Sequence, residues 1–345
     1  MSERYPRIRL RTRFGGYWIH EGLRLDFYMR RPHTQMARAV MRSMDTYLDA
    51  VGAENFALYV DDEGDFQELD AEGWAFTRRH LLEDPWPRVI LEEASTGAPE
   101  RYQFEYYGRR IDDPELPVSA KHACVASFWL PSEYLEEHGP ERVRALALEL
   151  AAPLPFCSGN VGLAFLGPND VVGVTEEIRE RCFRYPGMDI PDVVSFAYNI
   201  GTRVRGPSWL TFLGQPVLGE LGGVDALRAR LHSPGTTVQD LDGGRAVVTL
   251  GEWPEAGDIE QGRTLPAYRA ARSRAGALAL RRAPVRQGLL SRRAAPLGAP
   301  VPRLTSLRPQ RANWSRKVLA PGAGLSGPVP KSTGARKVPV RALSP

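Results

Sequence analysis

The stretch from residue 23 to residue 65 most constrains the fold, because its hydrophobic period changes twice. Apolar and polar residues alternate over 23–31, which is the period of a strand with one buried face. Pro32 suits the first turn of a following helix, and Gly52 suits its end. A second strand is predicted at Asn55–Val60, so the stretch forms a strand–helix–strand unit. The helix is indicated by apolar residues spaced three and four apart, namely Met36, Val40, Met44, Tyr47, Leu48 and Val51.

The same order of elements recurs further along the chain. Strand, strand, helix, strand and helix are predicted within 7–83 and again within 102–184. Residue identities barely match between the two halves. The repeat could therefore reflect an ancient duplication or only the order of elements that α+β chains commonly have, and both alternatives remain open. A closing section, 205–268, adds a strand, a helix and a hairpin that turns at Asp242-Gly243-Gly244. We therefore predict an α+β domain over 5–268, with mixed or antiparallel sheets packed against helices.

Charge divides the chain at residue 269. Residues 269–345 contain 14 Arg, 3 Lys and no acidic residue, whereas 1–268 holds the other 28 basic residues and all 41 acidic ones. The body therefore has a net charge of −13 and the C-terminal segment a net charge of +17. This segment has too little apolar surface to offset its ordering entropy, so we predict a disordered basic tail.

The basic tail has two interpretations. Its cations would bind any nucleic acid through counterion release, without sequence preference. Mixtures of Arg, Ala, Pro and Gly without acids are also typical of GC-rich DNA read out of frame, and this interpretation is favoured. A one-base shift near codon 269 that restores an acidic, apolar-patterned helix would support it.

The loop after the second strand, formed by Asp61, Asp62, Glu63 and Asp65, is the obvious candidate for a metal site. A calcium loop requires glycine at its sixth position, where this chain has Phe66. The six histidines show no H-x-x-H spacing, so no zinc site is predicted either. We interpret the loop as a solvated strand end and predict neither a metal nor a cofactor.

Catalytic motifs are similarly lacking. The chain has no G-x-S-x-G elbow, no G-x-G-x-x-G loop and no P-loop. Cys157 is a candidate nucleophile only if the fold brings a histidine to it, and a buried turn is the simpler interpretation. Three widely spaced cysteines and no long apolar segment predict free thiols, a cytoplasmic location and no membrane span. The sequence favours a protein that is not an enzyme.

Several strings between residues 130 and 213 resemble the type VI secretion immunity family, formerly a domain of unknown function. They are Leu130-Pro-Ser-Glu-Tyr-Leu135, the segment from Leu154 to Phe165, Arg184-Tyr-Pro-Gly-Met-Asp189, Gly201-Thr-Arg-Val-Arg-Gly206 and Trp209-Leu-Thr-Phe-Leu213. The resemblance covers about 5–268. It implies an immunity protein for a VRR-Nuc nuclease effector delivered by type VI secretion. Family members end in one more ordinary helix, which the basic tail replaces here.

This resemblance agrees with the charge of the body. A nuclease presents a basic surface to DNA, and an acidic protein would be steered toward that surface and cover it. Asp61, Asp62, Glu63 and Asp65 are then predicted to contact the nuclease. Many cytoplasmic proteins are acidic for solubility alone, so charge by itself assigns no interface. Two alternatives stay open: nucleic-acid binding through the tail, and an enzyme with Cys157 as its nucleophile.

Overall fold

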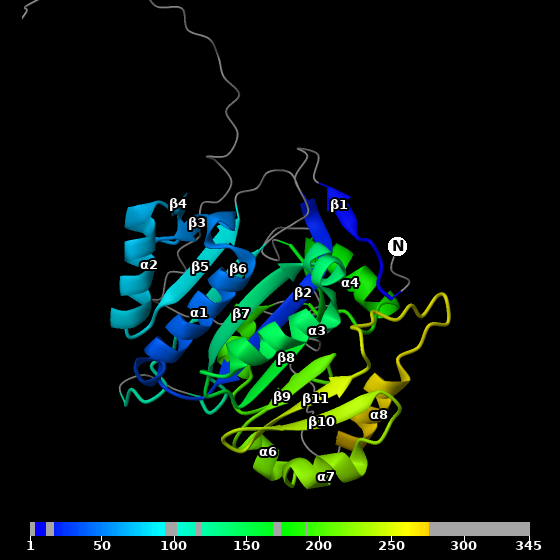
Figure 1. The fold of residues 1–345 in the computed structure, drawn as a ribbon. Coiled ribbons are helices and arrows are strands. Elements are labelled where there is room, and N and C mark those ends of the chain that lie inside the picture. Colours follow the sequence, from blue (N-terminus) through cyan, green and yellow to red (C-terminus); the bar gives the residue numbers. More distant parts are fainter. Residues whose placement is uncertain are drawn as a thin grey trace, which may run out of the picture. The chain divides into compact units, whose positions relative to one another are not determined.

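The computed structural model describes residues 4–11, 17–93, 102–114, 119–167, 174–190 and 192–275. Its strands form one eleven-stranded sheet in the order β10-β11-β9-β8-β2-β7-β6-β5-β3-β4, with β1 paired to β2 (Figure 1). Every strand pairing is antiparallel, which confirms the predicted α+β class. The strands are β1 (Arg9–Arg11), β2 (Tyr17–Met29), β3 (Phe56–Val60), β4 (Phe66–Glu68), β5 (Arg88–Glu93), β6 (Gln103–Tyr107), β7 (Cys124–Pro131), β8 (Ser158–Leu166), β9 (Leu210–Leu213), β10 (Thr236–Leu241) and β11 (Arg245–Leu250).

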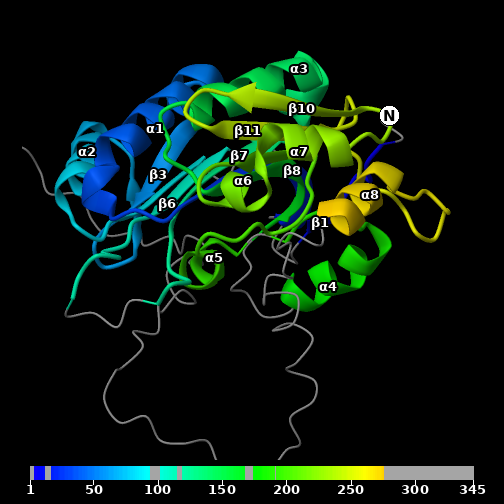
Figure 2. The same ribbon diagram turned by 90° about the horizontal axis from the view of Figure 1, so that it is seen from below.

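Helices lie on both faces of this sheet. Figure 2 shows α1 and α3 on one side of the strands and α4 and α5 on the other. The α-helices are α1 (Ala37–Val51), α2 (Ala71–Glu83), α3 (Ser132–Ala151), α4 (Val174–Arg184), α5 (Val193–Asn199), α6 (Val217–Glu220), α7 (Gly223–Arg230) and α8 (Pro266–Ala275). None of these helices is both long and apolar enough to cross a membrane.

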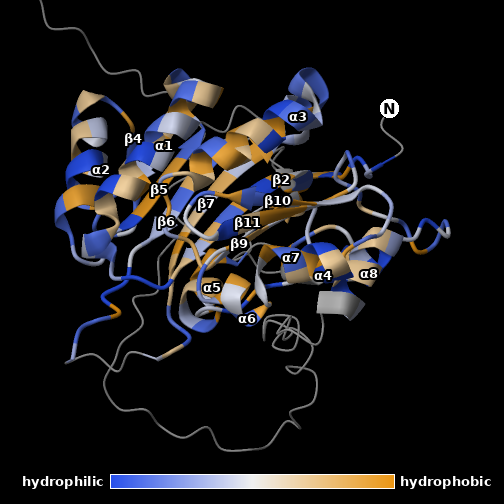
Figure 3. Ribbon diagram, turned by 60° about the horizontal axis from the view of Figure 1, so that its bottom comes forward, coloured by the Kyte–Doolittle hydropathy of each residue, from blue (hydrophilic) through white to orange (hydrophobic). Residues whose placement is uncertain are grey.

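The face beneath α1 and α3 carries the main hydrophobic core. Leu23, Leu25 and Phe27 of β2 contribute to it, together with the predicted apolar side of α1. Hydrophobic residues gather on the strands beneath these helices, and hydrophilic residues on their outer turns (Figure 3). Ser43 Oγ of α1 donates a hydrogen bond of 2.9 Å to the carbonyl of Leu150, which joins α1 to α3. The strand–helix periodicity of 23–51 is therefore confirmed.

The alternation in β2 was expected to mark one buried face, and this expectation is wrong. Arg24, Asp26 and Tyr28, which occupy the other face, are also fully buried. Alternation shows which residues share a face but cannot show whether a polar face is solvated or paired with buried partners. Here α5 covers Tyr28 through Phe196, and Arg205 contacts Asp26.

Helices α6, α7 and α8 pack near the C-terminal strands. Leu227 of α7 and Ala271 of α8 lie in one apolar cluster with Val248 and Leu250 of β11. Helix α8 continues past Tyr268, so the first residues of the predicted basic tail are helical. Residues 276–345 lie outside the described part of the chain, and the predicted disorder of the tail stays a prediction there.

The predicted strand, strand, helix, strand, helix order occurs in 102–184, whereas β4 adds a strand before the last helix of 7–83, and the strands of the two halves are also arranged differently. Helix α3 connects β7 to β8, which flank β2. Helix α1 connects β2 to β3, and three strands, β7, β6 and β5, lie between them. A shared origin of the halves stays a prediction.

Candidate functional site

The acidic loop, defined as Asp61, Asp62, Glu63 and Asp65, is the turn between β3 and β4. Asp61 differs from the others, because its Oδ1 accepts hydrogen bonds from the amides of Glu63 at 3.0 Å and Asp65 at 2.9 Å. Its Oδ2 accepts another from Gln67 at 2.7 Å. Slight burial opposes ionisation, but these hydrogen bonds outweigh it and lower the pKa of Asp61. Asp61 therefore holds the turn together, while the other three carboxylates are exposed.

The loop belongs to a longer acidic segment. Residues 54–77 contain eight acidic residues and no Lys or Arg. His80 of α2 connects the loop to the end of that helix, because its Nδ1 lies 3.4 Å from Asp62 Oδ1 and 3.4 Å from Asp84 Oδ2. The His80 ring stacks on Phe76 at a centroid distance of 5.4 Å. The structure therefore exposes Asp62, Glu63 and Asp65 on one turn and links Asp62, through His80, to Asp84.

Neither a metal centre nor a nucleophile pair forms at the residues that the sequence singled out. In the described ranges, no group of three or more His, Cys, Asp or Glu side chains converges as a metal site would. Cys157 is buried, and burial raises the pKa of its thiol, which lowers the fraction of reactive thiolate. The open cleft of about 500 Å³ beside Cys157 is lined by Arg30, Arg31 and Arg245, with no histidine among its described lining residues.

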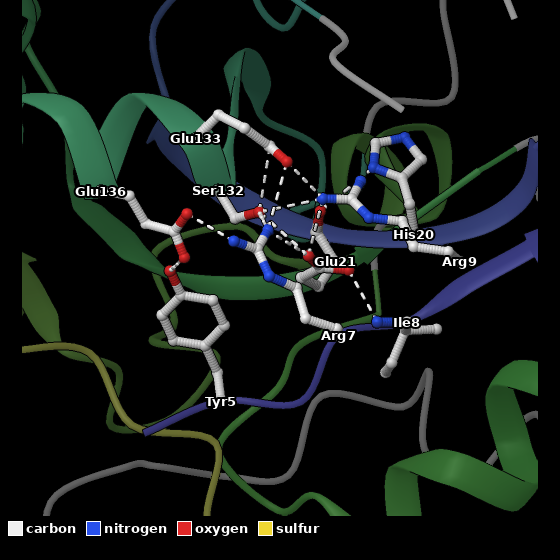
Figure 4. Close-up of polar contacts among 9 residues, drawn as sticks. All are labelled: Tyr5, Arg7, Ile8, Arg9, His20, Glu21, Ser132, Glu133 and Glu136. Atoms are coloured by element: carbon white, nitrogen blue, oxygen red, sulfur yellow. Dashed lines mark hydrogen bonds and ion pairs between the residues drawn. The ribbon is translucent and has the colours of Figure 1, made fainter. Parts of the chain in front are cut away.

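A buried carboxylate that sequence reasoning missed lies at the N-terminal end of the molecule (Figure 4). Glu21 of β2 is completely buried. Its Oε1 accepts from Ser132 Oγ at 3.0 Å and lies 3.3 Å from Arg7 Nη1 and 2.9 Å from Arg9 Nη2. Its Oε2 accepts the Ile8 amide at 2.8 Å. Both carboxylate oxygens are thus occupied by donors, which compensates the cost of burying the charge.

Glu133 and Glu136 of α3 extend this cluster. Arg7 and Arg9 both contact Glu133, and Arg7 also pairs with Glu136. The Tyr5 hydroxyl donates to Glu136 at 2.9 Å, and burial together with that carboxylate raises the pKa of Tyr5. The cluster fastens the N-terminal segment to β2 and to the first turns of α3. Because its carboxylates are already paired, its role is structural rather than catalytic.

A second buried network lies on the opposite face of β2. Arg24 Nε donates to Asp26 Oδ1 at 2.8 Å and to Ser127 Oγ at 3.0 Å. Asp26 Oδ2 accepts from Arg205 Nη1 at 3.1 Å, and Arg205 also pairs with Asp189. Burial alone would lower the pKa of Arg205, but the nearby carboxylates of Asp189 and Asp26 raise it, so the guanidinium stays charged.

Three of the strings that carry the family resemblance lie at or beside this second network, whereas the 130–135 string supplies Ser132 and Glu133 to the Glu21 cluster. Asp189 ends one of them and Arg205 lies in another. Asn160, from the string that enters β8, donates to the Gly206 carbonyl at 2.9 Å and to Ser208 Oγ at 3.0 Å. These residues hold Asp189 and the 205–208 segment against the sheet. The motifs therefore contribute to the assembly of the fold.

Comparison with known proteins adds a family and a fold. The family model TsiV, described as type VI immunity for VRR-NUC, matches residues 39–275. The T6SS protein PA0821 of Pseudomonas aeruginosa has a similar structure, with a TM-score of 0.63 and 20% sequence identity. The likeness covers 77% of this chain and 75% of that chain, and at this identity it shows the fold alone. No curated protein sequence matches the chain.

Proposed function

The chain belongs to the TsiV family, type VI immunity for VRR-NUC, and on this basis we propose that it is an immunity protein that binds and neutralises a cognate nuclease effector. The family match, which runs over 39–275, is the observation that carries the proposal. The proposed place of action is the cytoplasm of the cell that produces the effector, where an unchecked nuclease would reach that cell's own DNA.

Neutralisation by covering the nuclease requires a complementary surface and no catalytic residue. A nuclease surface that holds DNA is basic, and the body of this chain has a net charge of −13 over 1–268. The exposed carboxylates of Asp62, Glu63 and Asp65 supply negative charge that would steer such a partner. An interface of about 800 Å² on each protein would suffice for a stable complex.

The test uses the full chain and a candidate cognate VRR-Nuc domain, sought in the genes next to its own and made inactive by substitution. We expect the two proteins to associate at low salt in isothermal titration calorimetry. Co-expression of the full chain with the active effector should restore growth of cells that the effector alone kills. A pair that shows no association, together with no rescue, would sink the proposal.

Nucleic-acid binding through 269–345, the alternative function, gains no support from the family or the fold. Deleting 276–345 should leave effector binding unchanged. Loss of retention on a DNA column in the truncated protein would show only a non-specific, salt-sensitive contribution of the tail.

A further inference from the structure

Two exposed aromatic rings enclose a buried arginine near the acidic loop. Trp86 is 46% exposed and Tyr198 is 42% exposed, yet Arg109 between them is only 5% exposed. The Arg109 guanidinium carbon lies 5.4 Å from the Trp86 ring centroid and 4.0 Å from that of Tyr198. Arg109 Nη1 also donates to the Tyr198 hydroxyl at 3.1 Å. Trp86, Arg109 and Tyr198 are called the aromatic patch below.

The aromatic patch is held rigidly before any partner arrives. Trp86 lies between Pro85 and Pro87, whose rings fix the backbone, and its amide donates to Asp84 Oδ1 at 2.7 Å. The Arg109 carbonyl accepts the His33 amide at 3.0 Å, which fixes the base of the patch. Large rings held in one position contribute contact area on binding at little cost in conformational entropy.

The patch is continuous with the acidic loop. Asp84, which caps the Trp86 amide, faces His80, and His80 faces Asp62 of the loop. The side chain of Asp62 is 70% exposed. All of these residues lie at one end of the sheet, because β3 ends where β5 begins and Arg88 of β5 pairs with Tyr107 of β6. An aromatic centre thus borders a surface rich in carboxylates.

A second exposed apolar pair makes a useful contrast. Phe183 of α4 and Ile259 are 58% and 59% exposed. The carboxylates beside them are already neutralised, because Asp258 pairs with Arg184 at 2.8 Å and Glu260 pairs with the same arginine at 2.6 Å. The carboxylates beside this pair are thus bound by an arginine, whereas Asp62 and Asp84, near the aromatic patch, contact the imidazole of His80.

We infer that Trp86 and Tyr198 form the centre of the surface that binds the basic effector, with Asp62 and Asp84 at its rim. Lysine and arginine side chains of the partner lay their aliphatic stems on the exposed rings and direct their charges toward these carboxylates. Tryptophan, tyrosine and arginine are the residues that most often dominate binding energy at protein interfaces. This inference rests on the proposed function and names the residues that perform it.

The experiment compares the affinities of full-length variants for the inactive VRR-Nuc domain. Trp86→Ala and Tyr198→Ala should each weaken binding by about tenfold or more, which is the usual loss at a dominant interface residue. Phe183→Ala, the matched control of similar exposure, should change the affinity by less than about threefold. Thermal unfolding of each variant, followed by circular dichroism, shows whether a loss of affinity comes from a loss of folding. Trp86→Phe keeps an aromatic ring and should retain most of the affinity.

The outcomes distinguish this inference from the proposed function. If the Trp86→Ala and Tyr198→Ala variants both bind the effector domain with the affinity of the wild-type protein, the inference is overturned and the proposed function stands. A wild-type pair that does not associate would overturn both. Light scattering of the free protein gives its oligomeric state. If the protein forms a stable homodimer and Trp86→Ala dissociates it, the aromatic patch binds a second copy of the chain, which contradicts the inference.

Discussion

At the scale of single residues, Glu21 shows how a charge can be essential to a fold without any part in chemistry. Its carboxylate accepts an amide, a hydroxyl and two guanidinium groups from two other segments of the chain, residues 7–9 and the start of α3. Replacing it with alanine removes the acceptor of the Ile8 amide and leaves Arg7 and Arg9 only their carboxylate partners on α3. Such a loss costs far more than the removal of an exposed ion pair.

We expect Glu21→Ala to lower the free energy of unfolding by about 3–5 kcal/mol, the usual cost of breaking a buried charge pair. Urea denaturation followed by tryptophan fluorescence measures this change. Glu137→Ala, in which the substituted side chain is 76% exposed, is the control and should change stability by less than about 0.5 kcal/mol. Equal effects of the two substitutions would contradict a structural role for the Glu21 cluster.

Glu105 of β6 makes stability depend on pH. Burial, with a smaller contribution from the carboxylates of Glu92 and Asp26, raises its pKa to about 7 against the opposing charge of Arg24. Between about pH 4.5 and pH 7 the folded state keeps a proton that the unfolded chain releases, so stability falls as pH rises through this window.

Glu105→Gln removes the ionisation and with it this dependence. The variant should gain on the order of 1–3 kcal/mol relative to wild type at pH 8 and little at pH 4.5, after allowance for the partial exposure of the side chain. Thermal unfolding at the two pH values supplies the measurement. The same pH slope in both proteins would rule out Glu105 as its source.

At the scale of elements, the β3–β4 hairpin separates the four acidic residues into two roles. Asp61 supports the turn, while Asp62, Glu63 and Asp65 face solvent. Exposed charges affect the rate of association more than they affect stability, because water already screens them in the free protein. Substitutions at Asp62, Glu63 and Asp65 should therefore change the charge of the hairpin without changing its conformation, provided that Asp61 is not substituted.

Replacing Asp62, Glu63 and Asp65 together with lysine should slow association with the effector about tenfold at low salt. The difference should shrink as salt is added, and the melting temperature should stay near that of wild type. Stopped-flow fluorescence gives the rates. The control reverses three other exposed acids, Glu137, Glu141 and Asp225, with an equal change in net charge. An association rate that falls equally in both variants would remove the hairpin from the interface.

Helix α8 decides where the folded body ends. It carries Ala271 into the apolar cluster of α7 and β11, and the family match ends with it at residue 275. A chain cut after Ala275 should unfold at the same urea concentration as the full chain. A chain cut after Leu265 loses α8 and exposes part of that cluster, so we expect it to be less stable by about 2–4 kcal/mol. Equal stability of the two truncated chains would show that α8 adds nothing to the fold.

At the scale of the whole molecule, local patterns predicted many elements correctly. The helical spacing of 36–51 and the Asp242-Gly243-Gly244 turn both occur as expected. Each depends on residues close in sequence. Strand β5 was not predicted, because it directly follows Pro85 and Pro87. Helix α5 was not predicted, because its seven residues are too few to show a helical period.

The buried networks and the aromatic patch were beyond local reasoning. Arg24 and Asp26 have the pattern of a solvated strand face, and only Arg205, far along the chain, makes their burial possible. Trp86, Arg109 and Tyr198 come from three separate segments that the sheet and α5 bring together. Periodicity shows which residues share one face of a helix or strand. It does not show which residues from distant segments pack against that face.

By itself, the sequence determined the α+β class, the order of most elements, the acidic body with its basic tail, and the family that the chain belongs to. These properties follow from periodicity, charge and motif strings, which are written along the chain. Only the tertiary structure decided which charges are buried in pairs and which remain exposed, because that depends on contacts between distant segments. It placed Glu21 and Asp26 inside the fold and left Asp62 exposed, and this partition of charge determines which carboxylates the proposed interface can use.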